Sequence, residues 1–175
     1  MEALTLFQES LNWLKDNYHT FEFFMERDVV WTMQNHLREK IKALGLSYRV
    51  VNDWPMIKNS KRSLCADLVI LNGDQIMLAA EFKYEPNHKR KLDYSENKLK
   101  ANVVFWSGEH SVEEDIRRIK EFRSNEQCSA DFVGVTIFID EDGRFYNKQT
   151  NFPGSSWQQW NNSVAVLISW AKNDH

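Results

Sequence analysis

The part of the sequence that most constrains the fold is the pair of apolar runs around Gly73 and Asp74. Residues 66–72 read ADLVILN and residues 75–85 read QIMLAAEFKYE. Two short apolar runs joined by a glycine-containing turn predict a β-hairpin. A hairpin this apolar must be buried within a larger sheet, so the rest of the chain has to supply further strands and the helices that cover them.

The sequence before the hairpin predicts two amphipathic helices followed by one strand. The first helix is expected over residues 3–17, and the second from about Phe21 to Leu44, where Gly45 is a natural stop. Residues 47–53 are expected to form a short strand and residues 54–63 a loop. The apolar positions of the second helix recur in steps of three and four and predict one buried stripe: Val30, Met33, Leu37, Ile41 and Leu44.

The sequence after the hairpin predicts one helix and two or three more strands. Residues 102–106 suit a short strand, and Ser111 begins a helix with a capping-box spacing to Glu114. The apolar, β-branched run 131–140 is typical of a strand buried on both faces. For residues 164–170, periodicity leaves a strand and a short helix open. The predicted buried positions of the helix are Val112, Ile116, Ile119 and Phe122.

This element order predicts an α/β protein with a mixed central sheet flanked by helices. With 175 residues, 42% of them hydrophobic, the chain is long enough for one substantial core, so a single domain over residues 1–175 is expected. No segment has the pattern of a secretory signal or a membrane span, which leads us to expect a soluble, cytoplasmic protein with no membrane partner. Two isolated cysteines, Cys65 and Cys128, indicate neither a disulfide framework nor a zinc site.

Two charged residues on the second hairpin strand point to a functional site. Glu81 and Lys83 are two positions apart, so their side chains project from the same face of the strand. Asp67, on the first strand, joins that face only in one register. A three-residue loop pairs Asn72 with Ile76 and sets Asp67 opposite Glu81, whereas a two-residue loop turns Asp67 to the other face.

Two carboxylates that converge with a lysine suit the hydrolysis of phosphodiester bonds. Hard divalent cations such as Mg²⁺ prefer oxygen ligands, and they can polarise a phosphate and activate a water. Asp67 and Glu81 would be the ligands, and the backbone carbonyl of Phe82 could add a third oxygen. Lys83 would orient or deprotonate the water, or stabilise the negative charge of the transition state.

These residues resemble the PD-(D/E)XK nuclease superfamily, whose pattern is an acid at a strand start, a hairpin, and then Asp/Glu-x-Lys on the next strand. The matching residues here are Asp67 and the triplet Glu81-Phe82-Lys83, while Ala66 stands where the family's nominal pattern has proline. The resemblance covers about residues 20–140. It implies a restriction-endonuclease-like αβββαβ core, a Mg²⁺ cofactor that Mn²⁺ can replace, and nucleic acid as the partner, with DNA favoured over RNA.

Members of this superfamily commonly carry a glutamate on a helix before the motif, and Glu26 occupies such a position. It falls on the apolar stripe, four residues before Val30. Two interpretations stay open: Glu26 reaches the metal or a second ion, or it is a first-turn glutamate that the helix dipole favours. Asp28 falls on the polar face and is expected to be solvated.

Three further charged residues are secondary candidates for the site. Asp115 lies near the apolar stripe of its helix with Arg118 one turn later, which fits a residue that positions Lys83 but fits a helix-start acid or a structural ion pair better. Glu85 continues the face of Glu81 and Lys83. Because Glu85 precedes Pro86 at the end of the strand, we expect it to be exposed.

The net charge of −3 does not by itself indicate a nucleic-acid-binding protein, but basic residues cluster on both sides of the motif. The expected phosphate contacts are Arg62, Lys89, Arg90 and Lys91. On charge alone, a solvated loop is the favoured interpretation of these clusters. Of the tryptophans, three are expected in the core and three as candidates for base stacking: Trp13, Trp31 and Trp106, and then Trp54, Trp157 and Trp160.

Three functions therefore remain distinct at this point. The first is a Mg²⁺-dependent endo- or exonuclease, for which a homodimer would be needed to cut both strands together. The second is a catalytically inactive module with the nuclease fold that binds nucleic acid or supports assembly, in which the three motif residues are splayed or salt-bridged without room for an ion. The third is a plain interaction protein in which they are exposed and far from any cleft.

Overall fold

The computed structural model describes residues 2–56, 64–88, 103–106, 108–146, 148 and 153–171. Within these residues the chain forms one six-stranded mixed sheet in the order β1-β2-β3-β4-β6-β5, together with three α-helices. The predicted α/β class is confirmed. The elements follow the chain as α1 (Ala3–Asn17), η1 (Tyr18–Thr20), α2 (Glu26–Ala43), β1 (Tyr48–Pro55), β2 (Cys65–Asn72), β3 (Gln75–Glu85), α3 (Val112–Glu121), η2 (Phe122–Ser124), β4 (Cys128–Asp140), β5 (Ser155–Gln159) and β6 (Ala165–Ala171).

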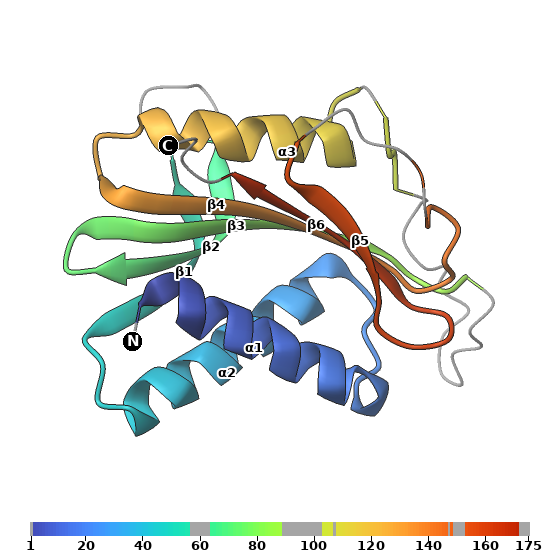
Figure 1. Cartoon of the computed structure of the whole chain (residues 1–175), viewed down its shortest axis with the longest axis horizontal. Helices are drawn as coiled ribbons and strands as arrows, with labels where there is room; N and C mark the ends of the chain where they lie inside the picture. Colours follow the sequence, from blue (N-terminus) through green and yellow to red (C-terminus); the bar gives the residue numbers. More distant parts are fainter. Residues whose placement is uncertain are drawn as a thin grey trace.

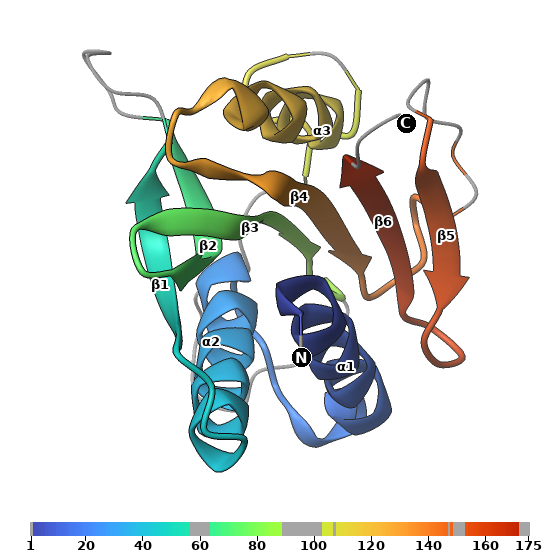
Figure 2. The ribbon, with the colours of Figure 1, turned by 60° about the vertical axis from the view of Figure 1, so that its left-hand side comes forward.

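The helices cover the sheet from both sides. Helices α1 and α2 lie together on one face and α3 lies on the other (Figure 1). Turned by 60°, the view shows α1 and α2 side by side beneath the central strands, with β5 at one edge of the sheet and β1 at the other (Figure 2). This is a three-layer arrangement in which the central strands, β3 and β4, are buried on both faces.

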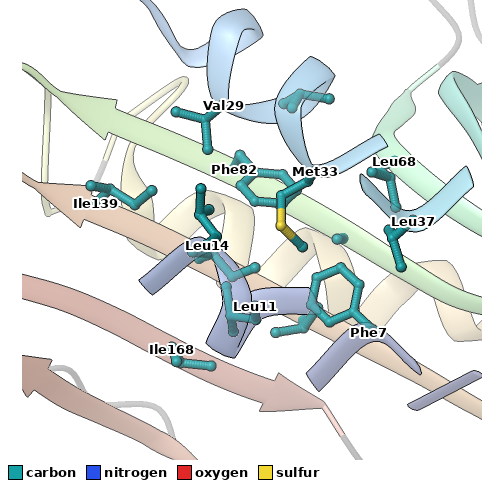
Figure 3. Close-up of a cluster of buried hydrophobic side chains, with 14 of the residues drawn as sticks. Phe7, Leu11, Leu14, Val29, Met33, Leu37, Leu68, Phe82, Ile139 and Ile168 are labelled. Carbon is teal, nitrogen blue, oxygen red and sulfur yellow. The ribbon is translucent and has the colours of Figure 1, made fainter. Parts of the chain in front are cut away.

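The main core lies between the helix pair and the sheet. Its side chains come from α1, α2 and one face of the central strands, as with Phe7, Met33 and Phe82 (Figure 3). The predicted stripe of α2 is buried at Val30, Met33, Leu37 and Ile41, but Leu44 is 48% exposed, because α2 ends at Ala43 and Leu44 is its C-cap.

Helix α2 begins later than the sequence predicted, at Glu26 rather than near Phe21. The Oδ2 atom of Asp28 accepts hydrogen bonds from the backbone N–H groups of Phe24 and Met25, at 2.9 and 3.0 Å. A first-turn carboxylate satisfies amides that the helix leaves unpaired, so it fixes the start of the helix. The expectation that Asp28 is merely solvated is wrong, since it has this capping role.

The hairpin is present, and its register is set by a turn and a bulge together. Asn72 pairs with Gln75, so the loop has two residues, Gly73 and Asp74. The register then shifts between Ile70 and Leu71, because Leu71 pairs with Ile76 but Ile70 pairs with Leu78. Met77 is the extra residue of a β-bulge, and it moves every later pair by one position.

The second half of the chain follows the predicted order with one correction. Ser111 Oγ accepts a hydrogen bond of 3.1 Å from the N–H of Glu114, as the capping-box spacing predicted, and α3 then leads into β4, which runs parallel to β3. Periodicity left a strand and a short helix open for residues 164–170, and the structure has the strand β6 from Ala165. The described residues 103–106 form no strand.

None of the helices in the described ranges has the length and apolar character needed to cross a membrane. Both cysteines are free thiols and half-buried.

Candidate active site

The bulge at Met77 decides whether Asp67 and Glu81 share a face. With the two-residue turn alone, Asp67 would oppose Ala80 and point away from Glu81. After the bulge, Leu68 pairs with Ala80, so the next position along brings Asp67 level with Glu81. The turn has two residues, which by itself would point Asp67 away from Glu81. The bulge at Met77 shifts the register by one residue and brings both side chains to the same face.

Asp67 is held against β3 by a backbone contact. Its Oδ2 accepts a hydrogen bond of 2.7 Å from the N–H of Phe82. Burial raises the pKa of Asp67, while the Phe82 N–H partly offsets that rise. Because the N–H and C=O of one strand residue point the same way, the carbonyl of Phe82 faces the same edge of β3 as the Asp67 carboxylate.

Glu81 is almost fully buried, with 1% of its surface exposed. Burial raises the pKa of Glu81 well above its ordinary value, and the neighbouring Asp67 carboxylate raises it further. Its Oε2 contacts Arg118 Nη2 at 2.8 Å, but its buried Oε1 has no hydrogen-bond partner. An unpaired buried carboxylate oxygen is costly, and a shared proton or a cation at that point would satisfy it.

Lys83 is held between two acids from opposite layers of the fold. Its Nζ lies 2.9 Å from Oδ2 of Asp115 on α3 and 3.8 Å from Oε2 of Glu26 on α2. Burial alone would lower the pKa of Lys83, but Asp115 and Glu26 outweigh it, so the net shift is upward. Lys83 is therefore a fixed cation at neutral pH, which favours charge stabilisation over proton abstraction.

Asp115 connects the two cations of the site. It has no exposed surface, and its Oδ1 lies 3.0 Å from Arg118 Nη2 while its Oδ2 binds Lys83. The sequence alone favours a helix-start acid or a structural ion pair over a link between Asp115 and Lys83. The structure does place Asp115 in the first turn of α3, and it also makes Asp115 the counter-charge that fixes Lys83.

The donor set suits a Mg²⁺-type ion. The described residues contain no group of three or more His, Cys, Asp and Glu side chains arranged to hold a metal. Mg²⁺ does not require one, since it is usually bound by one or two carboxylates together with waters and substrate phosphate oxygens. Asp67, Glu81 through its unpaired Oε1, and the Phe82 carbonyl provide that smaller set.

A cavity of ≈ 80 Å³ lies beside the carboxylates of Asp67 and Glu26, whereas Glu81 and Lys83 do not line it. Its lining comes from α2, β1 and β2: Glu26, Arg27, Val30, Trp31, Asn52, Asp53 and Asp67. A larger cavity of ≈ 530 Å³ lies between the end of α3 and the end of β6, lined by Ile119, Arg123, Phe132 and Trp170 among others. None of the predicted site residues lines this larger cavity, so we take the smaller one as the cavity of the candidate site.

Two residues of the smaller cavity, Trp31 and Asp53, were not predicted from the sequence to belong to the site. Trp31 was expected in the core, yet it is 54% exposed. Its position one residue past the stripe residue Val30, in line with the polar Asn35 and Arg38, was the available signal. Asp53 carries no motif, and nothing in the sequence distinguished it.

Several predicted residues lie elsewhere. Glu85 is fully buried, which contradicts the expected exposure: β3 stays paired with β4 up to Asp140, and Glu85 accepts a hydrogen bond of 2.6 Å from the N–H of Val103. Glu85 therefore anchors a loop. Trp106 is 47% exposed and Trp160 is buried, both contrary to expectation. The predicted phosphate contacts lie outside the described residues: Arg62, Lys89, Arg90 and Lys91.

Comparison of the chain with family models, curated proteins and solved structures finds no significant match.

Proposed function

We propose that this chain is a Mg²⁺-dependent nuclease of the PD-(D/E)XK type that hydrolyses phosphodiester bonds, with DNA favoured over RNA. The observation that carries the proposal is the convergence of Asp67, Glu81 and Lys83 at one point of the β2–β3 hairpin. That convergence depends on the Met77 bulge. The order α2-β1-β2-β3-α3-β4 also agrees with the αβββαβ core that the sequence resemblance implies.

In this proposal Asp67, Glu81 and the Phe82 carbonyl would hold the metal. When bound, the ion would supply a Lewis acid for the scissile phosphate and lower the pKa of the attacking water. The raised pKa values of Asp67 and Glu81 mean that these acids compete for protons in the free protein. Metal binding would therefore release protons and would strengthen as the pH rises.

Lys83 would stabilise the negative charge that develops on the phosphate. It is a protonated lysine in a site where water is mostly excluded, and a cation fixed in advance is most effective there. Asp115 would act as a positioning residue, because it is fully buried and holds the ammonium group without facing the substrate. Glu26 lines the cavity and would hold the same ammonium group from the substrate side. Arg118 would keep Glu81 oriented through its contact with Oε2.

The test is a cleavage assay with labelled single- and double-stranded DNA and RNA, in Mg²⁺ or Mn²⁺ and in EDTA. Asp67→Ala and Lys83→Ala should each abolish cleavage, and EDTA should do the same. Glu114→Gln, on an exposed face of α3, is the matched control and should retain full activity. Activity that survives both Asp67→Ala and Lys83→Ala would refute the assignment.

One observation favours a second function, a catalytically inactive module that binds nucleic acid. Glu81 already contacts Arg118 at 2.8 Å and Lys83 already contacts Asp115 at 2.9 Å. These ion pairs leave fewer oxygens for a metal than an open site would. Binding of DNA or RNA by the wild-type protein, with no cleavage of any substrate in Mg²⁺ or Mn²⁺, would establish this second function.

A further inference from the structure

We infer that Trp31 and Asp53 form a binding site for an unpaired nucleobase beside the carboxylates of the candidate active site. Trp31 would stack on the ring and Asp53 would accept a hydrogen bond from its exocyclic amino group. The inference rests on the proposal that the site binds nucleic acid. It adds the substrate class, single-stranded nucleic acid or a strand with an unpaired base.

The cavity links this site to the chemistry. Trp31 and Asp53 line the same ≈ 80 Å³ space as Asp67 and Glu26. A strand whose backbone passes the cavity beside Asp67 would therefore carry one nucleotide over the cavity. The cavity is too small to enclose a whole base, so only the polar edge of the base would enter it while the ring lies on Trp31.

Trp31 is suited to stacking because its ring is not used in the core. It is 54% exposed on the first half of α2, next to the buried Val30. Tryptophan combines a large aromatic face with a polar N–H group, and it is enriched at binding interfaces for that reason. Every base has a face that can stack on an indole ring.

Asp53 has an unusual backbone conformation that fits a binding role. Its φ is +52°, a left-handed value that aspartate tolerates better than most residues. The pairing of β1 with β2 includes Asn52 with Leu68 and Trp54 with Ala66, but it omits Asp53 and Asp67 between them. The pairing of β1 with β2 is thus interrupted at Asp53, level with Asp67, while β1 itself continues to Pro55. Residues held in such conformations cluster at functional sites.

The charge of the cavity selects the part of a nucleotide that can enter. Its charged lining residues are three acids, Glu26, Asp53 and Asp67, and one cation, Arg27, so the cavity as a whole disfavours phosphate. An amino group on a base, in contrast, donates hydrogen bonds to carboxylates. Cytosine carries such a donor at N4, and thymine has an acceptor at the equivalent position. In a duplex both the ring face and the paired edge are covered, so only an unpaired base can use the site.

The experiment measures binding without cleavage. Fluorescence anisotropy in EDTA would use fluorescein-labelled oligodeoxycytidylate, the corresponding oligodeoxythymidylate, and a mixed-sequence duplex. The wild type should bind the cytidylate strand more tightly than the thymidylate strand. Trp31→Ala should weaken binding of both single strands about ten-fold, with little effect on the duplex. Trp31→Phe should restore most of that affinity, because it keeps an aromatic face.

Two variants provide the remaining comparisons. Trp106→Ala removes a tryptophan of similar exposure, 47%, that does not line the cavity, and it should bind like the wild type. Asp53→Asn keeps a residue that tolerates positive φ but removes the carboxylate, and it should abolish the preference for cytidylate. The variant chains should show unchanged circular dichroism and thermal midpoints, since both positions are exposed.

The outcomes separate this inference from the proposed nuclease function. Equal binding by Trp31→Ala and the wild type, or no preference between the two single strands, would overturn the base site even if Mg²⁺ supports cleavage. Loss of binding in Trp31→Ala, with no cleavage under any condition, would support the base site and overturn the nuclease.

Discussion

Replacing Asp115 with asparagine should destabilise the protein strongly, although the change adds no volume and removes only a charge. Asp115 is fully buried and lies 2.9 Å from the Lys83 ammonium group and 3.0 Å from Arg118. Two unit charges at 2.9 Å attract by about 6 kcal/mol at an effective dielectric constant of about 20. Much of that attraction offsets the cost of removing the charges from water.

The net loss of stability depends on the charges that stay buried after the substitution. Removing one partner of a buried ion pair costs about 3–5 kcal/mol, because the other charge stays buried without compensation. Asparagine keeps one hydrogen-bond acceptor, Arg118 keeps Glu81, and Lys83 keeps the more distant Glu26, so we expect the lower end of this range. For a chain of this size a loss of about 3 kcal/mol lowers Tm by about 6–12 °C.

Thermal and urea unfolding of Asp115→Asn, at neutral pH and without divalent ions, would measure this loss. Glu114→Gln is the matched control: it makes the same acid-to-amide change one residue away, at an exposed ion pair with Arg117, and should leave Tm nearly unchanged. A fall in Tm for Asp115→Asn no larger than that of the control would show that the Lys83–Asp115–Arg118 network is not a buried, coupled unit. Asp115 would then not hold Lys83 as a fixed cation.

Three other predictions follow from the site and the fold. Because the pKa of Glu81 is raised, Glu81 keeps its proton to higher pH in the folded chain than in the unfolded chain. The free energy of unfolding should therefore fall as the pH rises from the unfolded pKa of Glu81 to its folded pKa. Glu81→Gln should flatten this dependence in melts recorded from about pH 4 to about pH 8; an identical slope would contradict the shift. Deleting Met77 removes the bulge and should turn Asp67 away from Glu81. Mg²⁺ should then no longer raise the Tm of a folded deletion variant. A Tm that still rises with Mg²⁺ would show that metal binding does not need the bulge. Burial raises the pKa of Cys128 to about 11, so iodoacetamide should modify it slowly in the folded protein at neutral pH and rapidly in urea, whereas fast modification without urea would contradict its burial.

Periodicity and capping signals predicted most of the fold. The stripes of α2 and α3, the Ser111 cap, the hairpin and the buried strand β4 all follow from local patterns, which report directly which face of an element is apolar. The late start of α2 was missed because Phe21 and Phe23 read as helix positions, while Asp28 in fact caps a helix that starts after them.

For the candidate site, the sequence predicted which charged residues come together but not how they are aligned. Strand parity was enough to associate Glu81 with Lys83. The alignment of Asp67 depended on a bulge at Met77, which no turn residue or period marks. Asp115, Trp31 and Asp53 approach the site from α3, α2 and β1, so their roles depend on how separate elements pack and not on any local sequence pattern.

The proposed function requires that Asp67 and Glu81 together hold a divalent cation. Titration of the protein with Mn²⁺, followed by electron paramagnetic resonance of the free ion, would measure this binding. We expect saturable uptake by the wild type that weakens at acid pH, as the two carboxylates take up protons, and that is lost in both Asp67→Asn and Glu81→Gln. Uptake that is unchanged in these two variants, or no uptake by the wild type at neutral pH, would contradict it.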